Sequence, residues 1–444
     1  MEILVKNGLL VTFDSINSVL KDSAVCIVDD RIEAIGKTSE LIAESGDVDK
    51  IIDAKGRVVM PGMICGHMHF YSAFARGMSL RESPHGFLEI LDKLWWKLDK
   101  TLLKEDAYYS ALLGYIDAVK SGTTTVIDHH ASPSYVTGSL DEIEKAGREL
   151  GVRSCLCYET TNRNGKDEAI EGLKENERFI KKCDSSDDMM KGLVGLHASF
   201  TLDDEELEEA SKLVQKHSTG VHVHVCEDKA DLEDSLKNYG ITVVERLDKF
   251  NLLTSKSVLA HCVHIMDKDY PLLTRTGSNI VHNPRSNMNN AVGSLNVFKL
   301  QENGLKFGLG TDGMSADMKD ELLVANLIHK HVQQDNRVGT GEVYEALFKT
   351  NPLIVKKIFG VEVGALEVGK KADVLVTDYV APTPLTENNV LGHVLFGIVN
   401  SQIRTTIING RICMEERVIP GIDERVIAEK CEELAVKAWS RLYE

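Results

Sequence analysis

Short apolar runs of strand type occupy both ends of the chain. Turn residues such as Asn7-Gly8 separate four of them near the N-terminus: Ile3–Val5, Leu9–Thr12, Ser23–Val28 and Arg31–Ile35. Similar runs recur near the C-terminus, at Ala372–Thr377 and Arg404–Ile412. Runs of this length bounded by turn residues predict an antiparallel sheet. The simplest interpretation is one small β-sandwich-like domain formed by both termini, with the middle of the chain inserted into it.

The middle of the chain alternates between β-branched apolar runs and segments of helical pattern. Eight runs are expected to be strands: Val58–Cys65, Thr123–Ile127, Val152–Tyr158, Gly192–His197, Gly220–Cys226, Ser257–His261, Asn279–His282 and Lys306–Asp312. Helical pattern fills most of the intervals, for example at Glu105–Lys120, Asp141–Leu150, Asp204–His217 and Thr242–Phe250. This alternation predicts an α/β fold, a (β/α)₈ TIM barrel with a fully buried parallel sheet.

A last helical pattern runs from Asp423 to Leu442. Its apolar residues recur every three or four positions, at Ile427, Cys431, Leu434 and Ala438. This spacing predicts an amphipathic helix that lies on the barrel. The expected organisation is therefore residues 1–57 as the first part of the β domain, 58–362 as the barrel, and 363–444 as the second part of the β domain with the final helix.

Composition narrows the classes of partner. The 444 residues are 43% hydrophobic and 27% charged, as in ordinary soluble proteins. The net charge of −17 and the lack of a Lys/Arg-rich run argue against nucleic acid as a partner. No apolar run approaches the ~20 residues of a membrane span, and Met1–Gly8 lacks the pattern of a signal peptide. Nine scattered cysteines suggest reduced thiols and a cytoplasmic location.

Histidines gather where the predicted strands end, which is where barrels carry their active sites. Six strand ends carry them, and an aspartate ends the eighth strand: His67 and His69, His129 and His130, His197, His222 and His224, His261, His282, and Asp312. His67 and His69 share one face of their strand and are suited to bind one divalent metal. An isolated His-x-His pair could equally be core filler. Histidines at six of eight strand ends favour a metal site.

Four motifs lie at these strand ends: His67-x-His69, His224-x-x-Glu227, Ala260-His261-Cys262 and Gly310-Thr311-Asp312-Gly313. They resemble the amidohydrolase superfamily, and more narrowly its mononuclear-metal aminohydrolase branch, which includes guanine, cytosine and S-adenosylhomocysteine deaminases and triazine chlorohydrolases. Two further segments resemble the strand-seven signature of that branch and its return into the small β domain: His282-Asn283-Pro284-x-Ser286-Asn287 and Gly364-x-x-x-x-Gly369-x-x-Ala372-Asp373. The similarity covers essentially the whole chain.

The resemblance implies a metal held by four side chains, His67, His69, His224 and Asp312, with one position left for water. Three imidazoles and a carboxylate suit Zn²⁺, and Fe²⁺ tolerates the same ligands. A metal of this kind lowers the pKa of bound water towards ~7.

The resemblance also implies three catalytic roles. Asp312 would take the proton of the water, Glu227 would move a proton to the ring nitrogen and on to the leaving group, and His261 would orient the water. The alternatives from the residues alone are an exposed loop acid for Glu227 and a structural histidine for His261.

Substrate contacts are less clearly marked. His197 resembles a substrate-binding histidine of the branch, and Asn283 could contact substrate, although loops favour Asn in any case. His129, His130 and Arg285 depart from the pattern of many relatives. Because Arg binds carboxylate or phosphate through two parallel hydrogen bonds, we hypothesise a substrate with an anionic group or a carbonyl-rich ring. The alternative is an ordinary surface arginine.

The expected activity is metal-dependent hydrolysis of C–N bonds other than peptide bonds. The expected reaction is deamination of a purine- or pyrimidine-like heterocycle with release of ammonia. Loss of another leaving group, opening of a cyclic C–N bond, and a non-catalytic scaffold with this fold remain open. The expected partner is a small heterocyclic substrate, and the oligomeric state is open, with a homodimer the commonest assembly in general.

Overall fold

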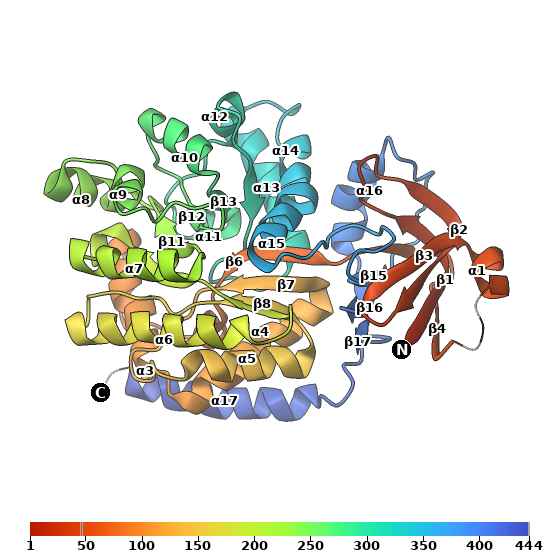
Figure 1. Ribbon diagram of the computed structural model, residues 1–444, viewed down its shortest axis with the longest axis horizontal. Coiled ribbons are helices and arrows are strands. Elements are labelled where there is room, and N and C mark those ends of the chain that lie inside the picture. Colours follow the sequence, from red (N-terminus) through yellow and green to blue (C-terminus); the bar gives the residue numbers. More distant parts are fainter. Residues whose placement is uncertain (45, 47, 443–444) are drawn as a thin grey trace.

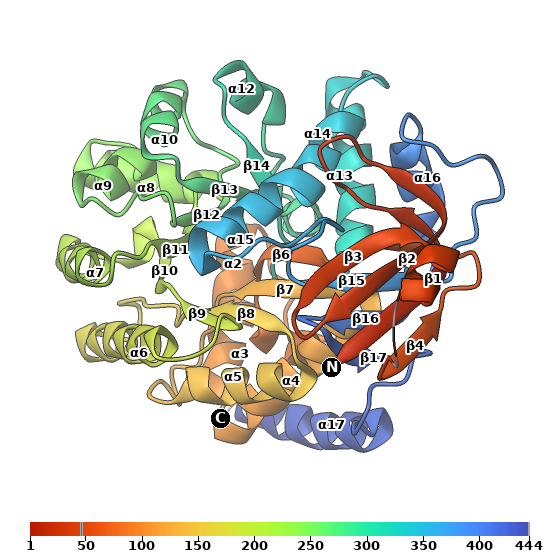
Figure 2. The same ribbon diagram turned by 45° about the vertical axis from the view of Figure 1, so that its right-hand side comes forward.

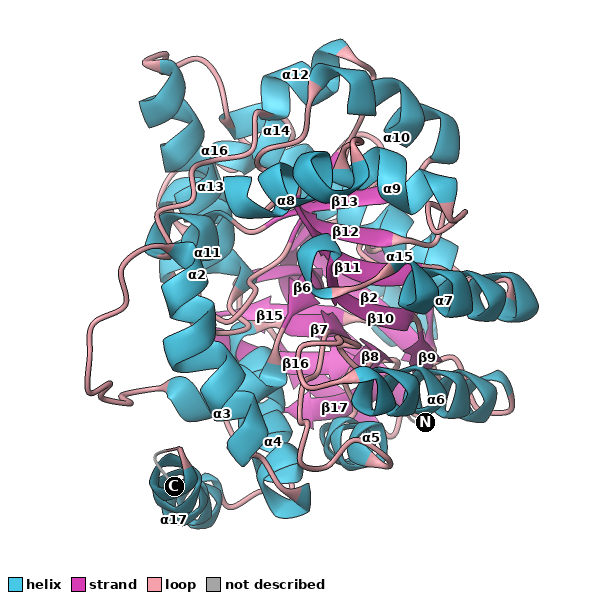
Figure 3. Ribbon diagram, turned by 90° about the vertical axis from the view of Figure 1, so that its left-hand side faces the viewer, coloured by secondary structure: helices cyan, strands magenta, loops and turns pink. Residues whose placement is uncertain are grey.

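A computed structural model describes residues 1–44, 46 and 48–442, and it places eight parallel strands around a central axis (Figures 1 and 3). These strands are β6 (Met63–Met68), β7 (Thr123–Asp128), β8 (Arg153–Leu156), β10 (Val194–Ala198), β11 (Val221–Val225), β12 (Val258–His261), β13 (Asn279–His282) and β14 (Phe307–Leu309). The short strand β9 (Met190–Gly192) pairs with β8.

Two isolated bridges join the two parallel sheets. Thr160 pairs with Leu196, next to β8 and β10, and Met68 pairs with Asp312, next to β6 and β14. The α/β class with parallel strands, consistent with a (β/α)₈ barrel, is thereby confirmed.

Helices follow the strands and cover the outside of the barrel (Figure 1). They are α4 (Lys104–Ser121), α5 (Ser139–Leu150), α6 (Lys166–Asp184), α7 (Asp204–His217), α8 (Lys229–Tyr239), α9 (Val243–Lys249), α10 (Tyr270–Thr276), α11 (Pro284–Asn289), α12 (Val297–Glu302), α13 (Met318–Gln333), α14 (Thr340–Glu345) and α15 (Asn351–Phe359). The four helices predicted by pattern correspond to α4, α5, α7 and α9, each within two residues at either end.

The two ends of the chain meet in one mixed sheet beside the barrel (Figure 2). Its strands are β1 (Glu2–Val11), β2 (Val19–Val28), β3 (Arg31–Lys37), β4 (Lys50–Asp53), β5 (Val58–Pro61), β15 (Val374–Thr377), β16 (Ile403–Ile408) and β17 (Arg411–Met414), with α1 (Thr38–Glu44) and α16 (Val390–Phe396) alongside. All eight strands belong to a single sheet in the described part of the chain, so the sandwich-like packing is not confirmed.

The first predicted barrel strand, Val58–Cys65, is in fact two strands. Its first half is β5, which pairs with β1 and β15 in the terminal sheet, and its second half is β6 in the barrel. Gly62 lies between them, and a Cβ at this position would overlap the side chain of Thr124. Both halves are buried and mostly apolar, so the run predicts one strand, although Pro61-Gly62 at the junction is a dipeptide typical of turns.

A buried ion pair links the terminal sheet to the barrel. Arg153 on β8 is fully buried, and its Nη1 lies 2.5 Å from Oδ2 of Asp373, just before β15. The same carboxylate accepts hydrogen bonds from the Thr124 hydroxyl at 3.2 Å and the Asn409 backbone N–H at 2.8 Å. These bonds satisfy a charge that would otherwise be costly to bury.

The C-terminal helix α17 (Glu424–Arg441) lies against the barrel as predicted. Its buried residues Cys431, Leu434 and Ala438 pack in one cluster with Tyr71 and Phe74 of the short helix η1 (Phe70–Ala75). The helix thus supports η1 and also contacts α3 (Trp96–Thr101). Between η1 and α3 the chain forms α2 (Phe87–Ile90) and the π-helical turn η2 (Leu91–Trp95). Among the described residues, no helix combines the length and apolar character needed to cross a membrane.

Candidate active site

A cavity opens at the carboxyl ends of the barrel strands, where the active sites of such barrels lie. The space between its walls, open mouth included, is about 660 Å³. Aromatic side chains form part of the wall: Tyr71, Phe87, Trp95, Trp96 and Phe200. Polar side chains form much of the rest: His69, Ser72, Glu159, His197, His224, Glu227, Asp228, Asp231, Ser286, Asn290 and Asp312.

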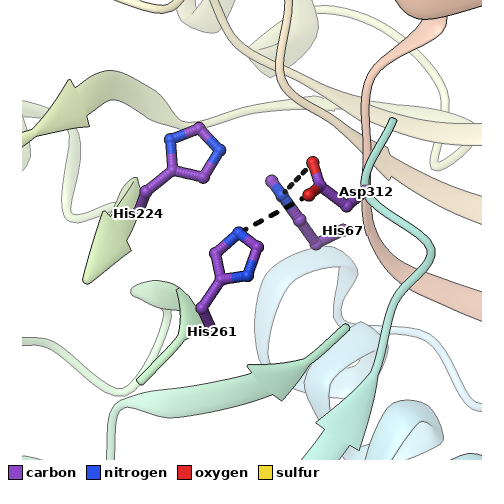
Figure 4. A group of neighbouring side chains, drawn as sticks. All are labelled: His67, His224, His261 and Asp312. Carbon is purple, nitrogen blue, oxygen red and sulfur yellow. Dashed lines mark ion pairs between the residues drawn. The ribbon is translucent and has the colours of Figure 1, made fainter. Parts of the chain in front are cut away.

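Side chains from separate strand ends converge on Asp312 (Figure 4). His67, His224, His261 and Asp312 each place one ligand atom within 4.8 Å of the others. Oδ1 of Asp312 lies 3.5 Å from Nε2 of His67, and Oδ2 lies 3.8 Å from Nε2 of His261. The Nε2 atom of His69 is 3.0 Å from Oδ1 of Asp312 and 3.1 Å from Nε2 of His224. All five side chains are buried.

Backbone carbonyls orient two of these imidazoles. Nδ1 of His69 lies 2.5 Å from the carbonyl oxygen of His129, and Nδ1 of His224 lies 2.8 Å from that of His197. Since a carbonyl can only accept, Nδ1 carries the proton in both rings. Their Nε2 atoms therefore present lone pairs towards Asp312, the arrangement by which outer contacts fix metal-binding histidines.

A longer chain of contacts orients His67. The Cys157 thiol donates to the carbonyl oxygen of Asp128 at 3.5 Å, and its sulfur lies 3.5 Å from Nδ1 of His222. Because the thiol proton is directed at Asp128, the sulfur accepts from His222, and the proton of the His222 ring is on Nδ1. Nε2 of His222 then accepts a hydrogen bond from Nδ1–H of His67 at 2.8 Å. Nε2 of His67 is then a buried lone pair with no hydrogen-bond partner in the described chain. Three such lone pairs beside one carboxylate fit a divalent metal.

His261 differs from the other imidazoles. Asn287 donates its Nδ2–H to Nδ1 of His261 at 2.8 Å, so the proton of this ring is on Nε2. That N–H points between Glu227 Oε2, at 3.5 Å, and Asp312 Oδ2, at 3.8 Å. His261 and Asp312 both have left-handed backbone, with φ of 72° and 55°. Such conformations are costly and cluster at functional sites.

The two acids of the site have opposite pKa shifts. Burial raises the pKa of Glu227 well above its usual value, and the negative charge of Asp312 nearby adds to this effect. A hydrogen bond from Asn290 at 3.1 Å lowers that pKa but does not cancel the rise. Burial alone would raise the pKa of Asp312 as well, but its contacts with the imidazoles of His67, His69 and His261 outweigh burial and hold that pKa well below its usual value. Two carboxyls whose environments separate their pKa values are suited to the roles of acid and base.

Glu159 is a site residue that the sequence patterns did not reveal. It follows β8 and is buried in the cavity wall. Its Oε2 lies 3.2 Å from Nδ1 of His129 and 4.0 Å from Nδ1 of His69, and its Oε1 lies 3.7 Å from Nε2 of His197. Burial would raise its pKa, but the neighbouring imidazoles hold the pKa of Glu159 well below its usual value. An acid directly after the run Val152–Tyr158 was the available signal.

The predicted substrate contacts are dispersed. His197 lines the cavity, whereas His129 lies behind the wall beside Glu159. His130 is buried against Ser132 Oγ at 2.9 Å, and Asn283 is fully buried. Among the described residues that line the cavity, His129, His130 and Asn283 are absent, and so is Arg285.

Arg285 faces away from the cavity. Its Nε lies 2.5 Å from Oε2 of Glu321, which is fully buried, and its Nη2 donates to the carbonyl oxygen of Ser315 at 2.8 Å. Next to it in the sequence, Ser286 does line the cavity and hydrogen-bonds to Oδ2 of Asp312. In this arrangement the strand-seven loop therefore presents Ser286 and Asn290, rather than Arg285, to the cavity.

Comparisons with known proteins agree with this geometry. The sequence model of the amidohydrolase family matches residues 58–413. The chain is 31% identical over 444 residues to the 5-methylthioadenosine/S-adenosylhomocysteine deaminase of Acetivibrio thermocellus, covering 98% of this chain and 99% of that protein. It is 32% identical over 446 residues to the 5'-deoxyadenosine deaminase of Methanosarcina acetivorans, with coverage of 98% and 99%. A zinc-bound adenosine deaminase structure from Xanthomonas campestris superposes with a TM-score of 0.86 at 20% identity, over 99% of this chain and 98% of that one.

Proposed function

The chain belongs to the amidohydrolase family, and we propose that it removes an amino group from a purine-like ring, with aminopurine nucleosides as the first substrates to test. It is a metal-dependent aminohydrolase. The relatives at 31–32% identity support a nucleoside as substrate, because they match over nearly their whole length.

The residues proposed to hold the metal are His67, His69, His224 and Asp312. The first three present Nε2 lone pairs, and the fourth is an ionised carboxylate between them. Zn²⁺ suits three imidazoles and one carboxylate. When bound, the metal acts as a Lewis acid that makes water nucleophilic at neutral pH.

Proton transfers are assigned to two acids and one imidazole. Asp312, whose pKa is held low, accepts the proton of the attacking water. Glu227, whose pKa is raised by burial, donates its proton to a ring nitrogen and takes up the proton of the new hydroxyl group, while the proton held by Asp312 passes to the departing amine. The N–H of His261 points between these two carboxyls and orients the water.

The observation that carries this proposal is the position of Glu227. It lines the cavity beside Asp312 and faces His261 at 3.5 Å, so an acid and a base lie on two sides of one imidazole. A substrate ring in the cavity, stacked on the aromatic wall, would meet both groups.

The test is ammonia release from a panel that contains 5'-deoxyadenosine, adenosine, guanine and cytosine. We expect release from at least one amino-heterocycle, and at least a thousandfold lower kcat for Asp312→Asn. Asp184→Asn, at the exposed end of α6, is the matched control and should keep full activity. A zinc-loaded wild-type protein that releases no ammonia from any member would contradict the proposal.

A further inference from the structure

The cavity wall is strongly acidic. Among the described residues that line it there is no lysine or arginine, and five carboxyls are present: Glu159, Glu227, Asp228, Asp231 and Asp312. Acidic walls in a site shielded from water repel anions and favour groups that donate hydrogen bonds. No side chain of the wall therefore offers the cation that would pair with the anionic substrate group that Arg285 had suggested.

Four of the five carboxyls have identified partners or roles. Asp231 accepts the backbone N–H groups of Phe200 at 3.1 Å and Cys226 at 2.8 Å. Asp228 caps α8 by accepting the N–H of Ala230 at 2.9 Å. Asp312 and Glu227 serve the proposed chemistry, so Glu159, whose neighbours are imidazoles, is the carboxyl to which no role has yet been assigned.

One oxygen of Glu159 is engaged and the other is available. Nε2 of His129 lies 3.1 Å from the carbonyl oxygen of His222, so this ring donates there, and its Nδ1 faces Oε2 of Glu159 at 3.2 Å. Oε1 faces Nε2 of His197 at 3.7 Å, on the cavity side of the wall.

His197 presents an acceptor at the same place. The Thr201 hydroxyl donates to the Ala198 carbonyl at 3.1 Å, so its oxygen accepts from Nδ1 of His197 at 2.8 Å. Nε2 of His197 therefore carries a lone pair. Two acceptors, Glu159 Oε1 and His197 Nε2, face each other without a donor between them, and such groups need a donor supplied from outside.

A second metal is the competing explanation for this cluster. His69, His129, Glu159 and His224 also bring ligand atoms within 4.8 Å of one another. However, His69 and His224 each have a single free lone pair, and both Nε2 atoms belong to the first site: that of His69 lies 3.0 Å from Asp312, and that of His224 lies 3.1 Å from Nε2 of His69. Only His129 and Glu159 would remain for a second ion, which is fewer ligands than a protein metal site uses.

We propose that Glu159 and His197 form an acceptor pair that recognises paired hydrogen-bond donors on an uncharged or cationic substrate. The donors are either N–H groups of the heterocycle or the two hydroxyls of an attached ribose. This inference rests on the proposed function, since it places a heterocycle in the same cavity.

The acceptor pair is close to the reacting centre. Glu159 Oε2 is 4.0 Å from Nδ1 of His69, and Nε2 on the other side of that imidazole is 3.0 Å from Asp312. A single imidazole ring thus separates the pair from the proposed metal ligands. A substrate ring attacked beside Asp312 would place its opposite edge, or the first atoms of its substituent, against Glu159.

The test measures binding and metal content separately from catalysis. The probes are adenosine and 2',3'-dideoxyadenosine, with adenine, guanine and cytosine as further donor-bearing compounds. Binding to the zinc-loaded protein is followed by fluorescence of Trp95 and Trp96, which line the cavity. The variants are Glu159→Gln and Glu159→Asp. Glu168→Gln is the matched control, because Glu168 lies outside the cavity wall and hydrogen-bonds to the Tyr158 hydroxyl at 3.2 Å.

Glu159→Gln should raise the Kd of adenosine at least tenfold, with zinc content unchanged and Glu168→Gln near wild type. Glu159→Asp, which keeps the charge, should recover part of the loss. An effect on adenosine but not on the dideoxy compound identifies ribose hydroxyls as the donors, and an equal effect on both identifies the base.

Three results would overturn the proposal: unchanged binding of every probe, loss of one metal equivalent in Glu159→Gln, or no binding of any donor-bearing compound by the wild type. Binding without ammonia release would contradict the proposed function while still testing the acceptor pair.

Discussion

Oε2 of Glu227 lies 3.5 Å from Nε2 of His261, and the imidazole proton points towards it. Burial raises the pKa of Glu227 and so favours the protonated form of this carboxyl. The pair therefore joins a proton donor to the group that orients the water.

Removing the proton of Glu227 should impair chemistry rather than binding of the metal. We expect Glu227→Gln to lower kcat by about 10²–10⁴-fold, because the amide cannot transfer a proton. Metal content should stay at the wild-type level, since Glu227 is not among the proposed ligands. Steady-state ammonia release with metal analysis of the same sample checks this, and a variant with wild-type kcat would exclude Glu227 as the acid.

The tautomer of His261 depends on Asn287. Replacing this residue in Asn287→Asp substitutes an acceptor for the amide that donates to Nδ1 at 2.8 Å, and so moves the imidazole proton from Nε2 to Nδ1. We expect kcat to fall at least tenfold with metal content unchanged. If the variant keeps its kcat, the N–H of His261 has no part in the reaction.

Arg285 should matter for stability more than for the substrate. Its partner Glu321 is fully buried, and removing one member of a buried pair typically costs about 3–5 kcal/mol. Arg285→Ala should therefore lower the free energy of unfolding in urea by that order, with kcat/KM within about threefold of wild type. A stable Arg285→Ala protein with a strongly raised KM would instead favour the substrate contact expected from the sequence.

A buried acid remote from the proposed ligands should make stability depend on pH. Burial raises the pKa of Asp99 to about 7, against the opposing charge of Arg163. Above pH ~4 the folded protein therefore holds a proton on Asp99 that the unfolded chain has lost. The stability that this proton contributes is fully present below pH ~4 and is lost as pH rises through 7.

The difference between this pKa and the usual value for Asp corresponds to at most about 4 kcal/mol of stability. Asp99→Asn removes the titration while keeping the shape. We expect the Tm of this variant to change less between pH 4 and 7 than that of the wild type. Parallel Tm profiles of the two proteins would show that Asp99 does not titrate in this range.

The strand ends were predictable because two signals coincide there. Apolar β-branched runs mark the strands, and a histidine or aspartate at the end of a run, such as His224 or Asp312, marks the side that carries the site. The deaminase-type motifs then specified which of these residues act together. Both signals depend only on local sequence, so they can be recognised without knowing how the chain packs.

Two features were hidden because they depend on the direction of side chains. Glu159 follows an apolar run without a histidine, and its role comes from His129 and His197, which belong to other strands. Arg285 and Ser286 are adjacent in sequence, yet the turn into α11 directs only Ser286 to the cavity. The change of sheet falls at Pro61-Gly62, a dipeptide typical of turns, inside a run whose flanks are both apolar.

The most direct test of the account is ammonia release measured on one preparation before chelation, after it, and after one equivalent of zinc is returned. The account predicts that activity on an amino-heterocycle disappears with the metal and returns at one ion per chain. Ammonia release that persists in the metal-free protein would contradict it.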